Sequence, residues 1–182
     1  MDKVPLPETP QRDLADPKTP PSLARQGLLT AELVALAQGG VSVILASCCA
    51  DGKPIAGIGV GARIDTAGTI RVFLTRQANL RLLEALEAGR AIAVTFSRAR
   101  DHVSFQVKAN GATILLASPD DTPEIARQSA VFRDELIGIN LPRHVAEGFT
   151  TYDPNDLLAI EFTPDRAYVQ TPGPGAGSPL SP

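Results

Sequence analysis

The chain has 182 residues, 43% of them hydrophobic, and a formal net charge of −3 at pH 7. That length suffices for one domain with its own apolar core, and the charge gives no general case for binding nucleic acid or an acidic membrane. No apolar run approaches the ~18 residues that a membrane span needs, and no secretory leader follows Met1. We therefore expect a cytoplasmic protein.

Proline and glycine mark the two ends of the predicted domain. Residues 1–22 contain six prolines and interspersed charges, which indicates a flexible or extended arm. The tail at residues 171–182 is rich in Pro and Gly, so it cannot hold a helix or an inner strand. The ordered domain is therefore predicted to cover residues 23–170.

Short elements follow one another through this domain. A short helix is expected near residues 30–37, because Thr30 can cap its start. The turn at residues 50–53 carries the Asp-Gly signal of a β-hairpin. A second helix is predicted at 79–88, and a third begins at Thr122, where a proline and an acid follow the cap. The predicted strands are residues 41–48, 54–64, 70–74, 91–96, 103–109, 157–162 and 166–170.

The spacing of these strands predicts the fold class. Strands joined by turns of two to four residues favour antiparallel pairing, and helices do not alternate with strands as in a parallel doubly wound sheet. The chain is therefore mainly β or α+β, with a closed or partly closed antiparallel barrel and a few short helices. The adjacent Cys48 and Cys49 would point to opposite faces of a strand, so we interpret them as small buried hydrophobic residues and not as a disulfide.

Positive charge gathers in the middle of this acidic chain. Residues 53–108 hold nine basic and four acidic side chains, a local charge of +5. Within them, the strand-to-helix junction FLTRQANLR (residues 73–81) places Arg76 before the second helix, with Asn79 and Arg81 at its start. Free N–H groups at a helix start and nearby arginines are typical of a phosphate site. The alternative is that Asn79 only caps the helix and that the arginines are solvated.

Three glycines alternate along the predicted second strand. Gly57, Gly59 and Gly61 share one face of that strand, which leaves the face without side chains. The string fits the dinucleotide pattern G-x-G-x-x-G/A, but no helix follows it, so a Rossmann site is not indicated. Either a flat ligand or another backbone lies against this face, or the glycines only allow close packing of strands.

Three motifs over residues 28–112 resemble a known family. They are the turn Asp51-Gly52-Lys53-Pro54, the strand end Leu74-Thr75 with Asn79-Leu80-Arg81 after it, and the strand Gln106-Val107-Lys108-Ala109-Asn110-Gly111. Their order is similar to that of the pyridoxamine 5′-phosphate oxidase-like family of split β-barrel flavoproteins. The chain departs from authentic oxidases: Gly57 and Ala62 stand where these have an arginine and a lysine, and Leu80 replaces a helix arginine. The resemblance therefore implies a relative and not an authentic pyridoxamine phosphate oxidase.

The resemblance implies a split β-barrel that binds FMN across the interface of a homodimer. A flavin reductase-like oxidoreductase is expected, and its small-molecule substrate cannot be read from the sequence. The sequence does not identify a catalytic acid or base, and it shows no spacing of residues typical of a metal site. The nominated cofactor-binding residues are Gly59, Val60, Gly61, Arg63, Leu74, Thr75, Arg76, Asn79, Leu80, Arg81 and Gln106.

Two alternatives keep the barrel and change its ligand. The first is another cofactor, either a deazaflavin or haem, and for haem His102 or His144 would have to be the axial ligand. The second is a cofactor-free dimeric module for binding or regulation, which the missing arginine and lysine favour.

Overall fold

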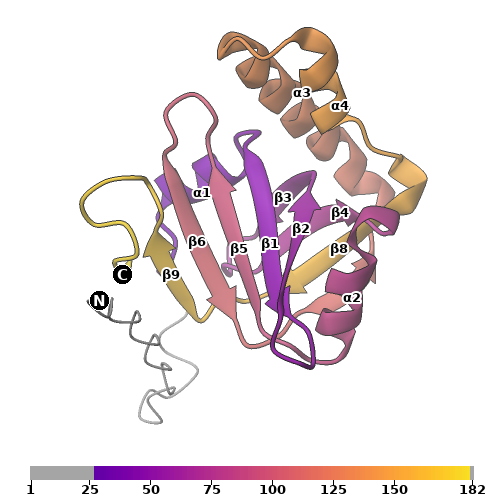
Figure 1. The fold of residues 1–182 in the computed structure, drawn as a ribbon, viewed down its shortest axis with the longest axis vertical. Helices are drawn as coiled ribbons and strands as arrows, with labels where there is room; N and C mark the ends of the chain where they lie inside the picture. Colours follow the sequence, from indigo (N-terminus) through magenta and orange to yellow (C-terminus); the bar gives the residue numbers. More distant parts are fainter. Residues whose placement is uncertain (1–26, 181–182) are drawn as a thin grey trace, which may run out of the picture.

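The computed structural model describes residues 27–180, so the predicted proline-rich arm lies outside the described residues. Figure 1 shows the arrangement of its helices and strands. In chain order they are α1 (Ala31–Ala37), β1 (Ser42–Cys48), β2 (Pro54–Gly59), β3 (Gly61–Ile64), β4 (Ile70–Thr75), η1 (Gln77–Asn79), α2 (Leu80–Glu87), β5 (Ile92–Ser97), β6 (Ser104–Ala109), β7 (Thr113–Leu116), η2 (Pro119–Asp121), α3 (Thr122–Gly138), α4 (Arg143–Thr150), η3 (Pro154–Asp156), β8 (Leu157–Phe162) and β9 (Arg166–Val169).

The strands form two antiparallel sheets. One has the order β2-β1-β5-β6-β9 and the other the order β3-β4-β8-β7. The prediction of an antiparallel α+β fold is therefore confirmed. None of the helices in the described part of the chain is long and apolar enough to cross a membrane.

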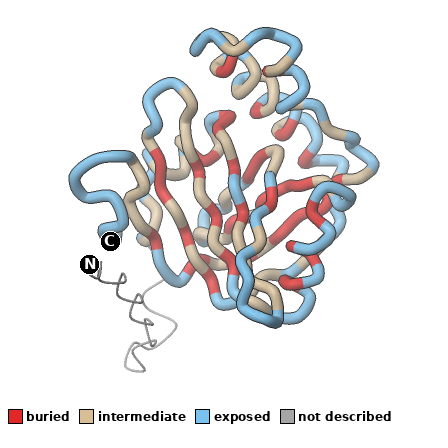
Figure 2. The backbone as a smooth tube through the Cα atoms, viewed as in Figure 1, coloured by how far each residue is buried: buried red, intermediate tan, exposed pale blue. Residues whose placement is uncertain are grey.

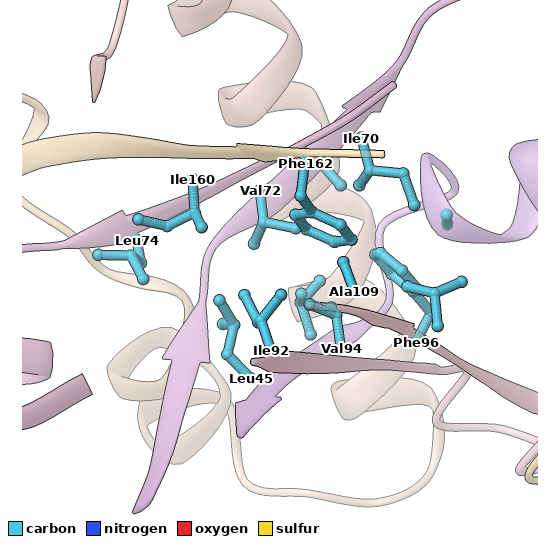
Figure 3. Close-up of a cluster of buried hydrophobic side chains, with 14 of the residues drawn as sticks. Leu45, Ile70, Val72, Leu74, Ile92, Val94, Phe96, Ala109, Ile160 and Phe162 are labelled. Carbon is cyan, nitrogen blue, oxygen red and sulfur yellow. The ribbon is translucent and has the colours of Figure 1, made fainter. Parts of the chain in front are cut away.

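The core lies between the two sheets. Figure 2 shows buried residues alternating with partly exposed ones along several strands, as expected when only one face of a sheet packs inward. Figure 3 shows Val72 and Phe162 of the four-stranded sheet above Val94 of the five-stranded sheet. Phe96 stacks on Phe105 with ring centroids 5.0 Å apart.

The predicted second strand is in fact two strands. The chain leaves the five-stranded sheet after β2 and enters the four-stranded sheet at β3, and the Val60 N–H donates to the Phe73 carbonyl at 2.7 Å. A side chain at Gly59 would meet Val43 Cγ1 and Val72 Cγ1 at 3.0 Å, so glycine allows the crossing. The alternation of residue types continues through the break, which is why the sequence predicts a single strand.

Other differences lie in the second half of the chain. The sequence prediction missed β7 and α4. The described part of the Pro/Gly-rich tail, up to Leu180, forms no helix and no inner strand, as predicted, and it lies along the outer edge of β9. There the Gly177 N–H donates to the Val169 carbonyl at 2.7 Å and the Leu180 N–H to the Ala167 carbonyl at 2.8 Å.

Candidate functional site

Asn79 is buried at the strand-to-helix junction, with 3% of its surface exposed. Its Nδ2 donates to the carbonyls of Thr75 (2.8 Å) and Ile58 (3.3 Å), and its Oδ1 accepts from the Ile58 N–H (3.0 Å). It makes no side-chain cap on α2. Asn79 therefore holds the edge of β2 against the junction, and it is neither the predicted phosphate donor nor the alternative helix cap.

A carboxylate already lies at the start of the junction. The Gln77 N–H donates to Asp156 Oδ2 at 3.0 Å, and the Arg76 N–H donates to the Asp156 carbonyl at 2.9 Å. A negative side chain at a helix start interacts favourably with the free N–H groups there. Two backbone donors at the junction are thus occupied by a residue almost 80 positions away, which no local pattern could have revealed.

Arg63 lies away from the junction. It pairs with Arg71 across β3 and β4, and at ~3.3 Å per residue Arg71 is ~13 Å from Thr75. The Arg63 Nη1 atom is 2.7 Å from Oδ1 of the buried Asp121. The expectation that Arg63 supports the junction is therefore wrong, because the Arg63 guanidinium is paired with Asp121 at the start of α3.

Arg76 and Arg81 remain as exposed cations near the start of α2. Among the described residues, neither forms an ion pair with a carboxylate, and Arg81 Nη2 donates to Cys49 Sγ at 3.3 Å. The Asp51 carboxylate lies near Arg81. Hydrogen bonds from Lys53 hold the pKa of the Asp51 carboxyl below its usual range, and the Arg81 charge contributes. Cys48 and Cys49 are free thiols, partly exposed rather than buried.

The glycine face of β2 and β3 is filled by the chain itself. A side chain at Gly57 would meet Asn79 Oδ1 and Leu82 Cδ2, and one at Gly61 would meet Gln128 Oε1 at 2.9 Å. The hypothesis of a flat ligand on this face is therefore wrong, and the alternative of close packing is confirmed.

The other nominated residues are dispersed. Leu74 is fully buried in the core, whereas Leu80 is 54% exposed at the start of α2. Gln106 lies on the outer face of the five-stranded sheet, where its Nε2 donates to Thr95 Oγ1 at 2.9 Å. Gly59 and Val60 line an apolar groove of about 150 Å³ between the first two strands and the α3–α4 helices.

Comparisons with known proteins identify the fold. The sequence matches no protein-family model and no curated protein. The structure is similar to HupZ of Group A Streptococcus, with 15% identity, a TM-score of 0.50, and coverage of 82% of this chain and 99% of that one. The described domain therefore shares its fold with HupZ.

Solved structures similar to this chain include proteins of the group that the sequence resembles. A provisionally assigned pyridoxamine 5′-phosphate oxidase of Lactobacillus delbrueckii is 15% identical over 78% of this chain and 93% of that one, with a TM-score of 0.49. A pyridoxamine 5′-phosphate oxidase-related, FMN-binding protein of Nostoc punctiforme is 9% identical over 78% and 82%, with a TM-score of 0.43. At such identities the likeness concerns the fold alone.

Two features remain as candidate parts of a site, a pair of cations and an apolar groove. Arg76 and Arg81 supply positive charge near the start of α2, and the apolar groove begins at Ile58 to Val60. The Asn79 side chain links Ile58 of the groove to the strand end at Thr75, whereas the Arg81 guanidinium contacts Cys49, which is ~17 Å along β1 from Ile44 of the groove. Such an arrangement can bind a molecule with an anionic end and an uncharged planar end.

Proposed function

We propose that this chain is an FMN-binding redox protein. Arg76, Arg81 and the Thr75 hydroxyl would hold the phosphate, and the flavin ring would lie beside Gly59 and Val60 on the groove side of the strand, opposite the glycine face that the chain itself fills. The observation that supports this most directly is the bonding of Asn79 to both Ile58 and Thr75, which links the groove lining to the strand end that precedes Arg76. FMN, when bound, supplies the hydride chemistry, and the chain positions the ring and the substrate.

The residues present fit FMN through side chains and not through the helix start. Charge-assisted hydrogen bonds from two guanidinium groups suit a phosphate dianion. The groove has no ionisable residue among those described, which suits an uncharged ring. Asp156 occupies the Gln77 N–H, so the backbone at the junction adds no donor there.

The proposal includes a homodimer formed through the outer face of the five-stranded sheet. No helix covers the middle of this face in Figure 1. Register pairs place Ile44 beside Ile58, and Ala46 between Ala56 and Ala93. Ile44 and Ile58 are 38% and 59% exposed. A contiguous exposed apolar patch of this kind marks an interaction surface, and a second copy of the chain would bury it.

The absorption spectrum of the purified protein tests this function, together with its melting temperature with and without added FMN. A yellow protein with flavin bands, or a rise in melting temperature on adding FMN, supports the proposal. A colourless protein that FMN does not stabilise contradicts it. A Soret band would instead indicate haem, bound by His102 or His144.

The second candidate is a dimeric binding module without a cofactor. It is favoured by the junction, where Asp156 and Asn79 use donors and acceptors that a phosphate would need. This candidate predicts a colourless dimer with an unchanged melting temperature in FMN.

A further inference from the structure

The groove between the sheet and the α3–α4 helices has the form of a site for a small molecule. Its floor includes Ile44, Ile58 and Val60, its wall includes Phe132 and Leu136 of α3, and Phe149 of α4 lies at its edge. We propose that it binds a small, uncharged, largely apolar molecule of about the size of a single or fused aromatic ring.

Helix α3 is fixed to the sheets by a polar clamp, which defines the wall of the groove. The Gln128 side chain is buried and bonds both backbone groups of Ala62, accepting from the N–H at 2.9 Å and donating to the carbonyl at 2.7 Å. The ion pair of Asp121 with Arg63 holds the start of the helix. Figure 1 shows α3 and α4 side by side at the end of the sheets where β1 begins.

The chemistry of the lining selects the class of ligand. Twelve described residues line the groove, and none of them carries an ionisable side chain. A charged group placed there would lose its hydration without gaining a partner, which disfavours anions and cations. Cavities of about 150 Å³ lined by aliphatic and aromatic side chains are known to take molecules such as benzene.

Hydroxyl groups supply a limited polar complement. Ser42, Ser129 and Thr150 lie in the lining, and Thr150 Oγ1, which donates to the Ala146 carbonyl at 3.0 Å, can still accept a hydrogen bond. The expected ligand therefore has an apolar body and at most one neutral donor.

Ile44 and Ile58 belong both to the groove and to the proposed dimer face, so in a dimer the second copy would close one side of the groove. The role of its occupant as the substrate of a flavin rests on the proposed function, because Gly59 and Val60 belong to both sites. The substrate of such an enzyme would be uncharged and apolar.

Indole and indole-3-acetate form a matched pair of probes, neutral and anionic. The chain has no Trp, so indole fluorescence anisotropy can be read directly as full-length protein is added. We expect saturable binding of one indole per chain, and binding of indole-3-acetate that is weaker by about tenfold or more.

Two variants locate the bound probe. Phe149→Asp places a carboxylate at the groove on a residue that is 63% exposed, so the fold should survive, and it should weaken indole binding by about tenfold. Leu116→Asp changes a 78% exposed leucine outside the groove and should leave binding unchanged. Equal effects of the two variants, equal affinity for the two probes, or no saturable binding would overturn the inference.

The indole titration is made on protein freed of FMN, because a flavin ring beside Gly59 and Val60 would occupy part of the same groove. A protein that binds indole and not FMN supports the groove and contradicts the proposed function. A protein that binds FMN but does not bind indole after FMN is removed supports the proposed function and contradicts the inference about the groove.

Discussion

The Asn79 side chain uses both of its amide donors and its carbonyl oxygen inside the chain, on the Thr75 carbonyl and on the two backbone groups of Ile58. Strand β2 is the edge strand of its sheet, so these bonds satisfy backbone groups that would otherwise have no partner strand. The buried Asn79 amide thus satisfies the backbone groups of Ile58 at the sheet edge and holds β2 against the start of α2.

Asn79→Asp tests this role with almost no change in shape. The aspartate loses both donors and sets a carboxylate oxygen against two carbonyls in a buried place, so the free energy of unfolding should fall by about 2–3 kcal/mol. Urea unfolding measures the change. Asn140→Asp is the matched control, because Asn140 is exposed and aspartate also tolerates its positive φ of 68°. Equal urea midpoints for the two variants would contradict the role.

At the scale of elements, α3 packs where Gly40 removes a side chain. A Cβ at Gly40 would lie 2.6 Å from the Gln128 carbonyl oxygen and 2.8 Å from Val131 Cβ, and its φ is +79°. Gly40→Ala should therefore lower the free energy of unfolding by about 2–4 kcal/mol, through strain and overpacking. Gly111→Ala meets nothing within 4 Å and should change it by less than about 0.5 kcal/mol. Similar losses in both variants would show that Gly40 is not required for the packing of α3.

The first turn of α3 also predicts a dependence on pH. The Arg127 guanidinium, with a further hydrogen bond from Gln128, lowers the pKa of Glu124 from 4.5 to about 2. A lowered pKa stabilises the folded state above the unfolded value, and this contribution is lost as the pH falls from about 4.5 to about 2.

Glu124→Gln should therefore cost about 1 kcal/mol at pH 6, a figure reduced for solvent screening, and nothing near pH 2. Denaturant unfolding at both pH values measures the two differences. Glu87→Gln, at an exposed position on α2, should leave stability at pH 6 unchanged within about 0.5 kcal/mol. A Glu124→Gln deficit that persists at pH 2 would contradict the assigned cause.

Helices and strands that are marked by short-range sequence patterns were predicted well. The cap at Thr30 is confirmed by its bond from the Leu33 N–H, and the antiparallel strands follow the predicted order. The division of the second strand was missed because alternation of residue types continues across Val60. Helix α4 was missed because its eight residues carry few apolar positions and no strong cap.

The candidate site was predicted less well, because long-range partners decide it. The sequence around Arg63 does not predict its ion pair with Asp121, and the sequence around Gln77 does not predict its hydrogen bond to Asp156. Both acids lie beside these residues only in the folded chain, because they are distant in the sequence. The glycine string was ambiguous for the same reason, since Leu82 and Gln128 fill the space beside it from elsewhere in the chain.

At the scale of the whole molecule, the proposed dimer depends on the outer face of the five-stranded sheet. Ile58→Asp places a charge in the middle of the apolar patch, so the proposed dimer should become a monomer with an intact fold. Sedimentation velocity measures the mass of the species. Leu116→Asp, at an exposed leucine on β7, should remain a dimer. A monomeric wild-type chain, or a dimeric Ile58→Asp variant, would contradict this interface.

The central claim is that guanidinium groups near the start of α2 hold the phosphate of FMN. It is tested most directly by calorimetric titration of FMN into the wild-type protein and into the Arg81→Ala variant. Loss of a charge-assisted hydrogen bond should weaken binding by about 1.5–3 kcal/mol, roughly 10- to 150-fold. Arg90→Ala, at the far end of α2, should bind FMN as the wild type does. Unchanged affinity in Arg81→Ala, or a wild-type protein that takes up no FMN, would contradict the claim.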